Sequence, residues 1–245
     1  MPRHKSYVPH GVIPAVLLPF DADLAIDEAS FRTHLSDVAA TPGVTGITIN
    51  AHSTEVASCT FDEQRRVLEV AQAEIGNRTP IVNGIWADGS IEAARLARMA
   101  SEGGASALLV FPPAPFTLGQ SPQMAITHFK RIADATDLPL IVFQYPLATG
   151  QGYPKDTLLK MCEEVPTIRA IKDWINNVST TSGTCARCRA CRGRSTCCRH
   201  TAPGYSPRWC SAATACCRAA AASSPTCSRS CLRPCSATTS PRRAR

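Results

Sequence analysis

The sequence predicts an α/β protein built as a (β/α)8 TIM barrel, incomplete here because about six β-α units precede the point where the pattern ends. Short runs rich in valine and isoleucine alternate with amphipathic stretches that open on helix-start signals, at intervals of roughly 25–35 residues. No G-x-G-x-x-G motif or P-loop follows these runs, which disfavours the other way of arranging such a sheet, a doubly wound nucleotide-binding fold.

The first three units are indicated by apolar runs and by the caps of the helices that follow them. Residues 11–20 form the first strand-like run, and residues 25–40 have apolar side chains near helical spacing. Thr60 and Glu63 have the spacing of a capping box, and Gly76 is a C-terminal stop. The expected strands are 11–20, 43–50 and 79–85, and the expected helices are 25–40, 60–76 and 90–102.

The next units repeat this pattern. Pro154 is expected to open a helix, because proline is favoured in the first turn. A complete TIM barrel has eight strands, so two units are missing from the pattern. The expected strands are 106–113, 138–146 and 167–174, and the expected helices are 121–135 and one from 154 onward.

A single lysine stands where the chemistry of a barrel is expected. Active residues of TIM barrels lie at the carboxyl ends of the strands, and Lys172 ends the sixth apolar run. Burial there disfavours the ammonium and can yield the neutral amine that attacks a keto group to form a Schiff base. The alternative interpretation is a solvated lysine paired with Asp173.

Hydroxyl groups follow other strands. Tyr145 and Ser53 stand at strand ends and could relay protons to such an imine, and His52 with Glu55 forms a candidate acid-base pair. In the alternative interpretation Tyr145 is a half-buried packing residue, whereas Ser53 and Thr54 belong to an ordinary turn or helix cap.

Five short motifs occur in order over about residues 8–178: "GVIP", "STE", "FPPAP", "QYPLATG" and "IKDW". In this order they resemble the dihydrodipicolinate synthase and N-acetylneuraminate lyase family, (β/α)8 enzymes that bind pyruvate or a related 2-oxo acid as a Schiff base. The resemblance implies that Lys172 forms the imine, that Ser53 and Thr54 hold the substrate carboxylate and that the chain forms a homotetramer. We expect no cofactor.

The sequence departs from the family pattern in the loops that carry these roles. The usual G-T-T-G-E loop reads "AHSTE", so Ser53 stands at the second threonine and Thr54 at the glycine. Phe143 replaces the expected catalytic tyrosine, and Ala148 replaces an arginine used for a dicarboxylic intermediate. Tyr145 lies on the same strand face as Phe143 and is the candidate substitute. We therefore expect a divergent lyase rather than a lysine-pathway synthase, with a 2-oxo-acid-binding pseudoenzyme as the alternative.

Residues 179–245 have a different composition. They contain twelve arginines, eleven of the 13 cysteines and no lysine, acid, isoleucine, valine, methionine or phenylalanine. Such a segment cannot bury a core of its own. We expect residues 1–178 to be a partial barrel and residues 179–245 to be a non-native, disordered tail produced by out-of-frame translation.

The genetic code supports this interpretation of the tail. In the neighbouring reading frame its cysteine codons become leucine, valine or methionine codons, and residues 195–198 become strand-like. The frame is expected to slip between about residues 174 and 181. The literal chain is expected to have little or no activity, because loss of two strands leaves a barrel sheet with open edges.

The cysteines of the tail also permit a metal-binding interpretation. Six candidate ligands lie near zinc or iron-sulfur spacing, and a basic tail could bind nucleic acid through phosphates. Irregular spacing and the absence of acids disfavour both, so neither a metal nor nucleic acid is expected. No apolar run reaches the ~18–20 residues of a membrane span, and we expect a cytoplasmic protein. The candidate ligands are Cys185, Cys188, Cys191, Cys197, Cys198 and His200.

Overall fold

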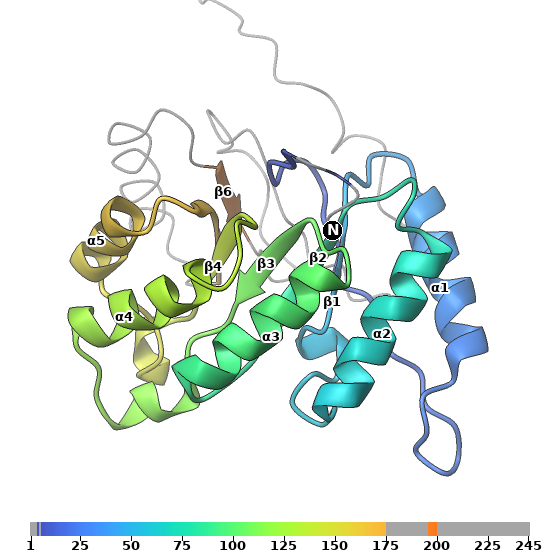
Figure 1. Cartoon of the computed structure of the whole chain (residues 1–245), viewed down its shortest axis with the longest axis horizontal. Coiled ribbons are helices and arrows are strands. Elements are labelled where there is room, and N and C mark those ends of the chain that lie inside the picture. Colours follow the sequence, from blue (N-terminus) through green and yellow to red (C-terminus); the bar gives the residue numbers. More distant parts are fainter. Residues whose placement is uncertain (1–3, 5, 175–195, 200–245) are drawn as a thin grey trace, which may run out of the picture.

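The chain folds into a parallel sheet with helices packed along one of its faces (Figure 1). A computed structural model describes residues 4, 6–174 and 196–199, the last of these as backbone only. The strands follow one another across the sheet in the order β1-β2-β3-β4-β5-β6. They are β1 (Ile47–Ile49), β2 (Ile81–Ile85), β3 (Ala107–Val110), β4 (Leu140–Gln144), β5 (Ile168–Asp173) and β6 (Thr196–Arg199).

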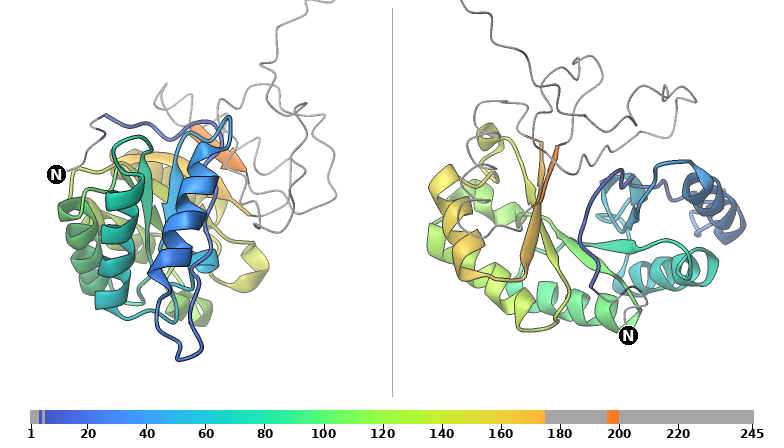
Figure 2. Two further views of the ribbon diagram at one scale, coloured as in Figure 1. Left: turned by 90° about the vertical axis from the view of Figure 1, so that its right-hand side faces the viewer. Right: turned by 90° about the horizontal axis from the view of Figure 1, so that it is seen from above.

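The helices cover the convex side of a curved sheet, as Figure 2 shows from above. This arrangement is that of a partial TIM barrel, as the sequence predicts. The α-helices are α1 (Glu28–Ala40), α2 (Phe61–Glu74), α3 (Ser90–Glu102), α4 (Pro122–Ala133) and α5 (Lys155–Glu164), and the 3-10 turns are η1 (His52–Thr54), η2 (Ala114–Leu118) and η3 (Leu147–Thr149).

Side chains alternate between two apolar layers along each strand. In β4, Leu140 and Val142 point outward into the larger cluster beneath the helices, whereas Ile141 and Phe143 point inward. Because neighbours in a strand face opposite sides of the sheet, Tyr145 joins Phe143 on the inner face. The inner layer therefore brings strand-end side chains together at the carboxyl edge of the sheet.

The helix boundaries follow the expected caps closely. Thr60 and Glu63 form both hydrogen bonds of the predicted capping box at the start of α2. Asp27 accepts a hydrogen bond from the backbone N–H of Ser30, so α1 begins at Glu28 rather than near residue 25. Pro154 is the N-cap residue of α5, so the helix begins at Lys155, one residue later than expected.

The first expected strand is wrong in its extent. Residues 11–20 form only isolated bridges, two of them parallel, from Val12 to Val44 and from Ala15 to Thr48, and one antiparallel, from Phe20 to Ile26. The run contains Pro14 and Pro19, and proline has no N–H to donate to a ladder. The segment nevertheless lies beside β1, since the N–H of Val16 donates to the carbonyl of Thr48 at 3.1 Å.

β6 lies within the segment expected to be disordered. It pairs in parallel with β5, with Ala170 opposite Thr196 and Asp173 opposite Arg199. β6 thus extends the sheet where the next strand of a barrel belongs. The remainder of residues 179–245 lies outside the described residues, and so do residues 175–178, which include the expected domain boundary.

Candidate functional site

Lys172 lies in the inner layer near the carboxyl end of β5. Its side chain is buried, with 8% of the residue exposed, and its Nζ atom lies 4.3 Å from the centroid of the Phe143 ring. Phe143 is the register partner of Lys172 on β4. Burial contradicts the solvated lysine of the alternative interpretation, whereas the pairing of Lys172 with Asp173 stays a prediction. Burial of this kind favours the neutral amine over the ammonium, whereas the ring face stabilises the ammonium.

Tyr145 lies beside Lys172 on the same inner face. It is 5% exposed, and its ring centroid is 4.8 Å from that of Phe143. Its hydroxyl shares a hydrogen bond with Nε2 of His52. Burial raises the pKa of Tyr145 above its usual value, so the hydroxyl keeps its proton at neutral pH. The two predicted catalytic residues, Lys172 and Tyr145, thus both contact the ring of Phe143.

His52 reaches this site from η1, the turn that follows β1. Its ring packs edge-on against Trp86 and Phe111, at centroid distances of 5.0 and 4.7 Å. Burial and the positive charge of Lys172 both lower the pKa of His52, which favours the neutral imidazole. The sequence suggested Glu55 as the partner of His52, but the imidazole pairs with Tyr145, 93 residues away.

The turn that carries His52 depends on Asn50 and Gly84. Asn50 adopts a left-handed conformation with a φ of 49°. Its buried amide donates to the carbonyl of Gln64 at 2.9 Å and to Oδ1 of Asn83 at 2.8 Å. A Cβ atom on Gly84 would lie 1.7 Å from the carbonyl oxygen of Asn50, so only glycine fits opposite this turn.

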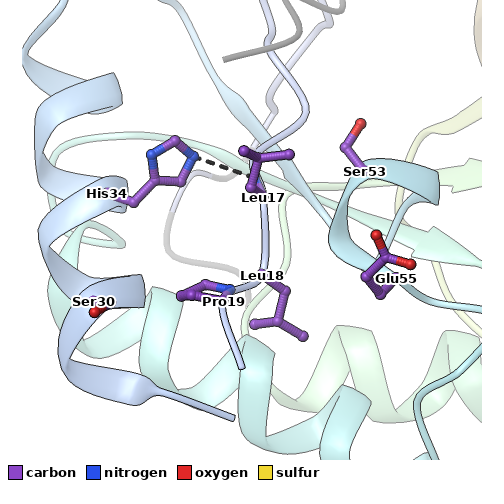
Figure 3. Close-up of a pocket in the computed structure, with 7 residues that line it drawn as sticks. All are labelled: Leu17, Leu18, Pro19, Ser30, His34, Ser53 and Glu55. Carbon is purple, nitrogen blue, oxygen red and sulfur yellow. Dashed lines mark hydrogen bonds between the residues drawn. The ribbon is translucent and has the colours of Figure 1, made fainter. Parts of the chain in front are cut away.

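Ser53 and Thr54 occupy the α1 side of the same turn. Thr54 is fully buried, and its hydroxyl donates to the carbonyl of Val16 at 2.9 Å. Ser53 and Glu55 line one side of a pocket, and His34 of α1 lines the other side, with residues 17–19 between them (Figure 3). In the same pocket, Nε2 of His34 accepts a hydrogen bond from the backbone N–H of Leu17. His52, by contrast, faces Tyr145.

Residues 4, 6–174 and 196–199 contain no cluster of three or more His, Cys, Asp or Glu side chains arranged to hold a metal ion. The cysteine-rich candidate ligands lie outside the described residues, apart from the backbone of Cys197 and Cys198. Among the described helices, none has both the length and the apolar character needed to span a bilayer.

Known proteins share the fold and the sequence pattern of this chain. Residues 8–191 match the model of the Dihydrodipicolinate synthetase family, a match that continues past Val178, where the resemblance was expected to stop. The 4-hydroxy-tetrahydrodipicolinate synthase of Bartonella henselae is 28% identical over 178 residues, which cover 73% of this chain and 60% of that protein. The synthase of Salinibacter ruber is 32% identical over 163 residues, covering 66% and 53%. The chain thus spans little more than half the length of these relatives.

Solved structures agree with this assignment of the fold. Dihydrodipicolinate synthase from Acinetobacter baumannii, solved as a chloride-inhibited complex with pyruvate, is 26% identical with a TM-score of 0.70. The synthase from Agrobacterium tumefaciens is 27% identical with a TM-score of 0.67. In both cases the alignment covers 78% of this chain and 63% of the other.

Proposed function

Because this chain belongs to the dihydrodipicolinate synthetase family, we propose that it is a class I aldolase-like lyase that binds pyruvate or a related 2-oxo acid as a Schiff base on Lys172. The observation that carries the proposal is the burial of Lys172 at the carboxyl edge of the sheet. Its Nζ atom lies there against the ring of Phe143, its register partner on β4. The pyruvate complex of the Acinetobacter baumannii relative supports the choice of substrate class.

The chemistry follows from the amine of Lys172. Its neutral form attacks the keto carbon, and the new C–N bond gives a carbinolamine. Protonation of the carbinolamine oxygen releases water and leaves a protonated imine. The imine makes the neighbouring C–H bond acidic, and loss of that proton gives an enamine whose carbon attacks an aldehyde to form the C–C bond. In the opposite direction the C–C bond breaks to release an aldehyde, and the enamine that remains takes up a proton. Hydrolysis of the imine then returns Lys172.

The remaining site residues divide into two groups. Tyr145 is the proton carrier in this proposal, because its hydroxyl stays protonated and its ring packs against Phe143, which Lys172 also contacts. Ser53 lines the pocket that it shares with His34 on the α1 side of the turn, so we assign it no contact with a substrate held on Lys172. The hydroxyl of Thr54 donates its proton to the carbonyl of Val16 and is fully buried, so we propose that Thr54 anchors this turn.

Borohydride trapping tests the assignment of Lys172. The full chain is incubated with pyruvate and sodium borohydride, and the modified peptide is identified by mass spectrometry. We expect a reduced adduct on Lys172 that forms slowly, because the barrel is incomplete, and none in Lys172→Arg. Lys160→Arg is the matched control, since Lys160 is exposed on α5. An adduct that persists in Lys172→Arg and is lost in Lys160→Arg contradicts the proposal.

A second candidate function is binding of a 2-oxo acid without turnover. It is favoured by Phe143, whose ring lies 4.3 Å from the Nζ atom of Lys172 and cannot transfer a proton. Steady-state assays with pyruvate and a panel of aldehydes separate the two functions. An adduct on Lys172 without product identifies the pseudoenzyme, whereas product formation excludes it.

Assembly and location complete the proposal. We propose that the intact family fold forms a homotetramer in the cytoplasm and acts on small molecules, without nucleic acid, membrane or a cofactor. Light scattering of the purified protein measures the mass in solution, and a monomer at micromolar concentration contradicts the tetramer.

A further inference from the structure

We propose that the aldehyde partner of this chain carries an aromatic ring, which packs among the aromatic side chains around Lys172. This inference rests on the proposed Schiff-base function and names the second substrate of the same site by its chemical class. Its basis is a group of six rings at the carboxyl edge of the sheet, which we call the aromatic cluster. The aromatic cluster consists of His52, Trp86, Phe111, Phe143, Tyr145 and Trp174.

Phe143 lies at the centre of the aromatic cluster. The Nζ atom of Lys172 lies 4.3 Å from the centroid of its ring. The ring centroids of Tyr145 and Phe111 lie 4.8 and 5.2 Å from that of Phe143, and that of His52 lies 6.0 Å from it. The amine that would hold the 2-oxo acid therefore lies against an aromatic surface.

Two tryptophans extend the aromatic cluster across the sheet from β2 to β5. Trp86 follows β2, and its ring centroid lies 5.4 Å from that of Phe111. Trp174 follows β5, and its ring centroid lies 5.5 Å from that of Tyr145. Phe111 and Tyr145 are buried, whereas Trp86 is half-buried and Trp174 is 36% exposed. Partly exposed rings at the carboxyl ends of barrel strands lie where such folds bind their substrates.

The ring geometry favours an aromatic ligand over a saturated one. The ring planes of Trp86 meet those of His52 and Phe111 at 74° and 67°, and those of Tyr145 and Trp174 meet at 89°. Aromatic pairs prefer such edge-to-face contacts, which stabilise them beyond the burial of their area. A planar aromatic group can add one more contact of this kind, whereas a saturated ring of similar size gains from burial alone.

The charges at the strand ends disfavour an anionic aldehyde. Because Lys172 is used by the 2-oxo acid, a carboxylate on the aldehyde has no cationic side chain to pair with in these segments, and burial of an unpaired charge is costly. The aldehyde is therefore expected to be uncharged as well as aromatic. Lys172 is the only lysine or arginine in the strand-end segments that the structure describes, which are residues 50–56, 83–89, 111–119, 143–153 and 171–174.

The reaction with an aromatic aldehyde is balanced without a further reactant. The enamine of pyruvate on Lys172 forms a C–C bond to the carbonyl carbon of the aldehyde, and the carbonyl oxygen takes up one proton to become a hydroxyl group. The proton lost when the enamine formed equals the proton taken up here. Hydrolysis of the imine consumes the one water that its formation released. The product is a hydroxy-2-oxo acid that carries the aryl group.

Competition between aldehydes tests the substrate class. The full chain is incubated with pyruvate and equal concentrations of benzaldehyde, cyclohexanecarbaldehyde and succinic semialdehyde, and the adducts on Lys172 are reduced with borohydride and distinguished by mass. We expect the adduct that contains pyruvate and benzaldehyde to exceed each of the other two aldol adducts about 10-fold. Trp86→Leu and Trp174→Leu should each reduce this preference. Phe116→Leu is the matched control and should keep it, since the buried Phe116 ring packs on Tyr153, outside the aromatic cluster.

Two results overturn the inference and leave the proposed function intact. One is a pyruvate adduct on Lys172 that takes up the three aldehydes equally or prefers succinic semialdehyde. The other is a preference for benzaldehyde that persists unchanged in both Trp86→Leu and Trp174→Leu, because the rings of the aromatic cluster then do not select the substrate. A chain that forms no pyruvate adduct contradicts the proposed function instead.

A binding measurement decides the inference in a chain that forms no aldol adduct. Benzyl alcohol has the ring but no aldehyde, and cyclohexylmethanol is its saturated counterpart. Their dissociation constants are measured by NMR titration of the full chain and of the same three variants. We expect benzyl alcohol to bind more tightly than cyclohexylmethanol, and to bind about 5-fold more weakly in Trp86→Leu and Trp174→Leu but not in Phe116→Leu. Equal dissociation constants for the two alcohols in the full chain overturn the inference, whether or not the chain is active.

Discussion

The Nζ atom of Lys172 lies 4.3 Å from the centroid of the Phe143 ring, directly across from it in the register of β5 and β4. The ring face attracts the ammonium form of the lysine by about 0.5–2 kcal/mol. This contact opposes the effect of burial, which favours the neutral amine. The reactivity of Lys172 therefore depends on the balance of the two.

Replacing Phe143 by leucine is expected to shift that balance toward the neutral amine. The pH at which adduct formation with pyruvate reaches half its maximal rate should move to a lower value in Phe143→Leu. Phe111→Leu is the matched control, because Phe111 is equally buried but is not stacked under Lys172. An identical shift in both variants means that general loosening of the aromatic cluster, and not the ring under the amine, is responsible.

His128 is expected to make the fold sensitive to acid. It is 2% exposed, contacts Ser90 at 3.0 Å, and burial lowers its pKa to about 4. The unfolded chain binds this proton near pH 6.5, so the free energy of unfolding should fall as the pH drops from about 6.5 to about 4. The full loss is about 3 kcal/mol.

Urea unfolding at pH 7.5, 5.5 and 4.5 measures this loss. The pH dependence should be smaller in His128→Gln than in the unsubstituted chain, whereas His10→Gln should leave it unchanged because His10 is exposed. Equal pH dependence in His128→Gln and the unsubstituted chain contradicts the assignment to His128.

Gly84→Ala is expected to damage both the fold and the site. The added methyl group would meet the carbonyl oxygen of Asn50 at 1.7 Å, so the turn before His52 has to move. We expect a loss of roughly 2 kcal/mol or more in the free energy of unfolding. Gly89→Ala is the control, since nothing lies within 4 Å of a Cβ atom there. Similar unfolding midpoints for the two variants would show that the turn adapts without cost.

The composition of residues 179–245 leads to a prediction about the gene. Sequencing across the codons for residues 174–181 should show that a single inserted or deleted base separates the two reading frames. A protein made in the restored frame should have leucine and valine in place of the cysteines and should form the Schiff base faster than the literal chain. An unbroken original frame in genomic DNA contradicts the frameshift.

Helices and strands were largely predictable because their signals are local. The capping box of Thr60 and Glu63 and the bounds of Ser90–Glu102 agree with the sequence pattern. The same pattern overestimated the strand in residues 11–20, because two prolines interrupt its hydrogen bonding without interrupting its apolar character. A pattern of apolar residues reports which side chains are buried, and backbone pairing needs N–H groups as well.

The site was predictable only in part. Lys172 and Tyr145 were identified because each ends an apolar run, a property visible along the chain. The partnership of His52 with Tyr145 spans 93 residues and depends on the curvature of the sheet and on the left-handed turn at Asn50. Local spacing thus assigns residues to strand ends, but contacts between them require the positions of strands across a barrel, which packing of the whole sheet establishes.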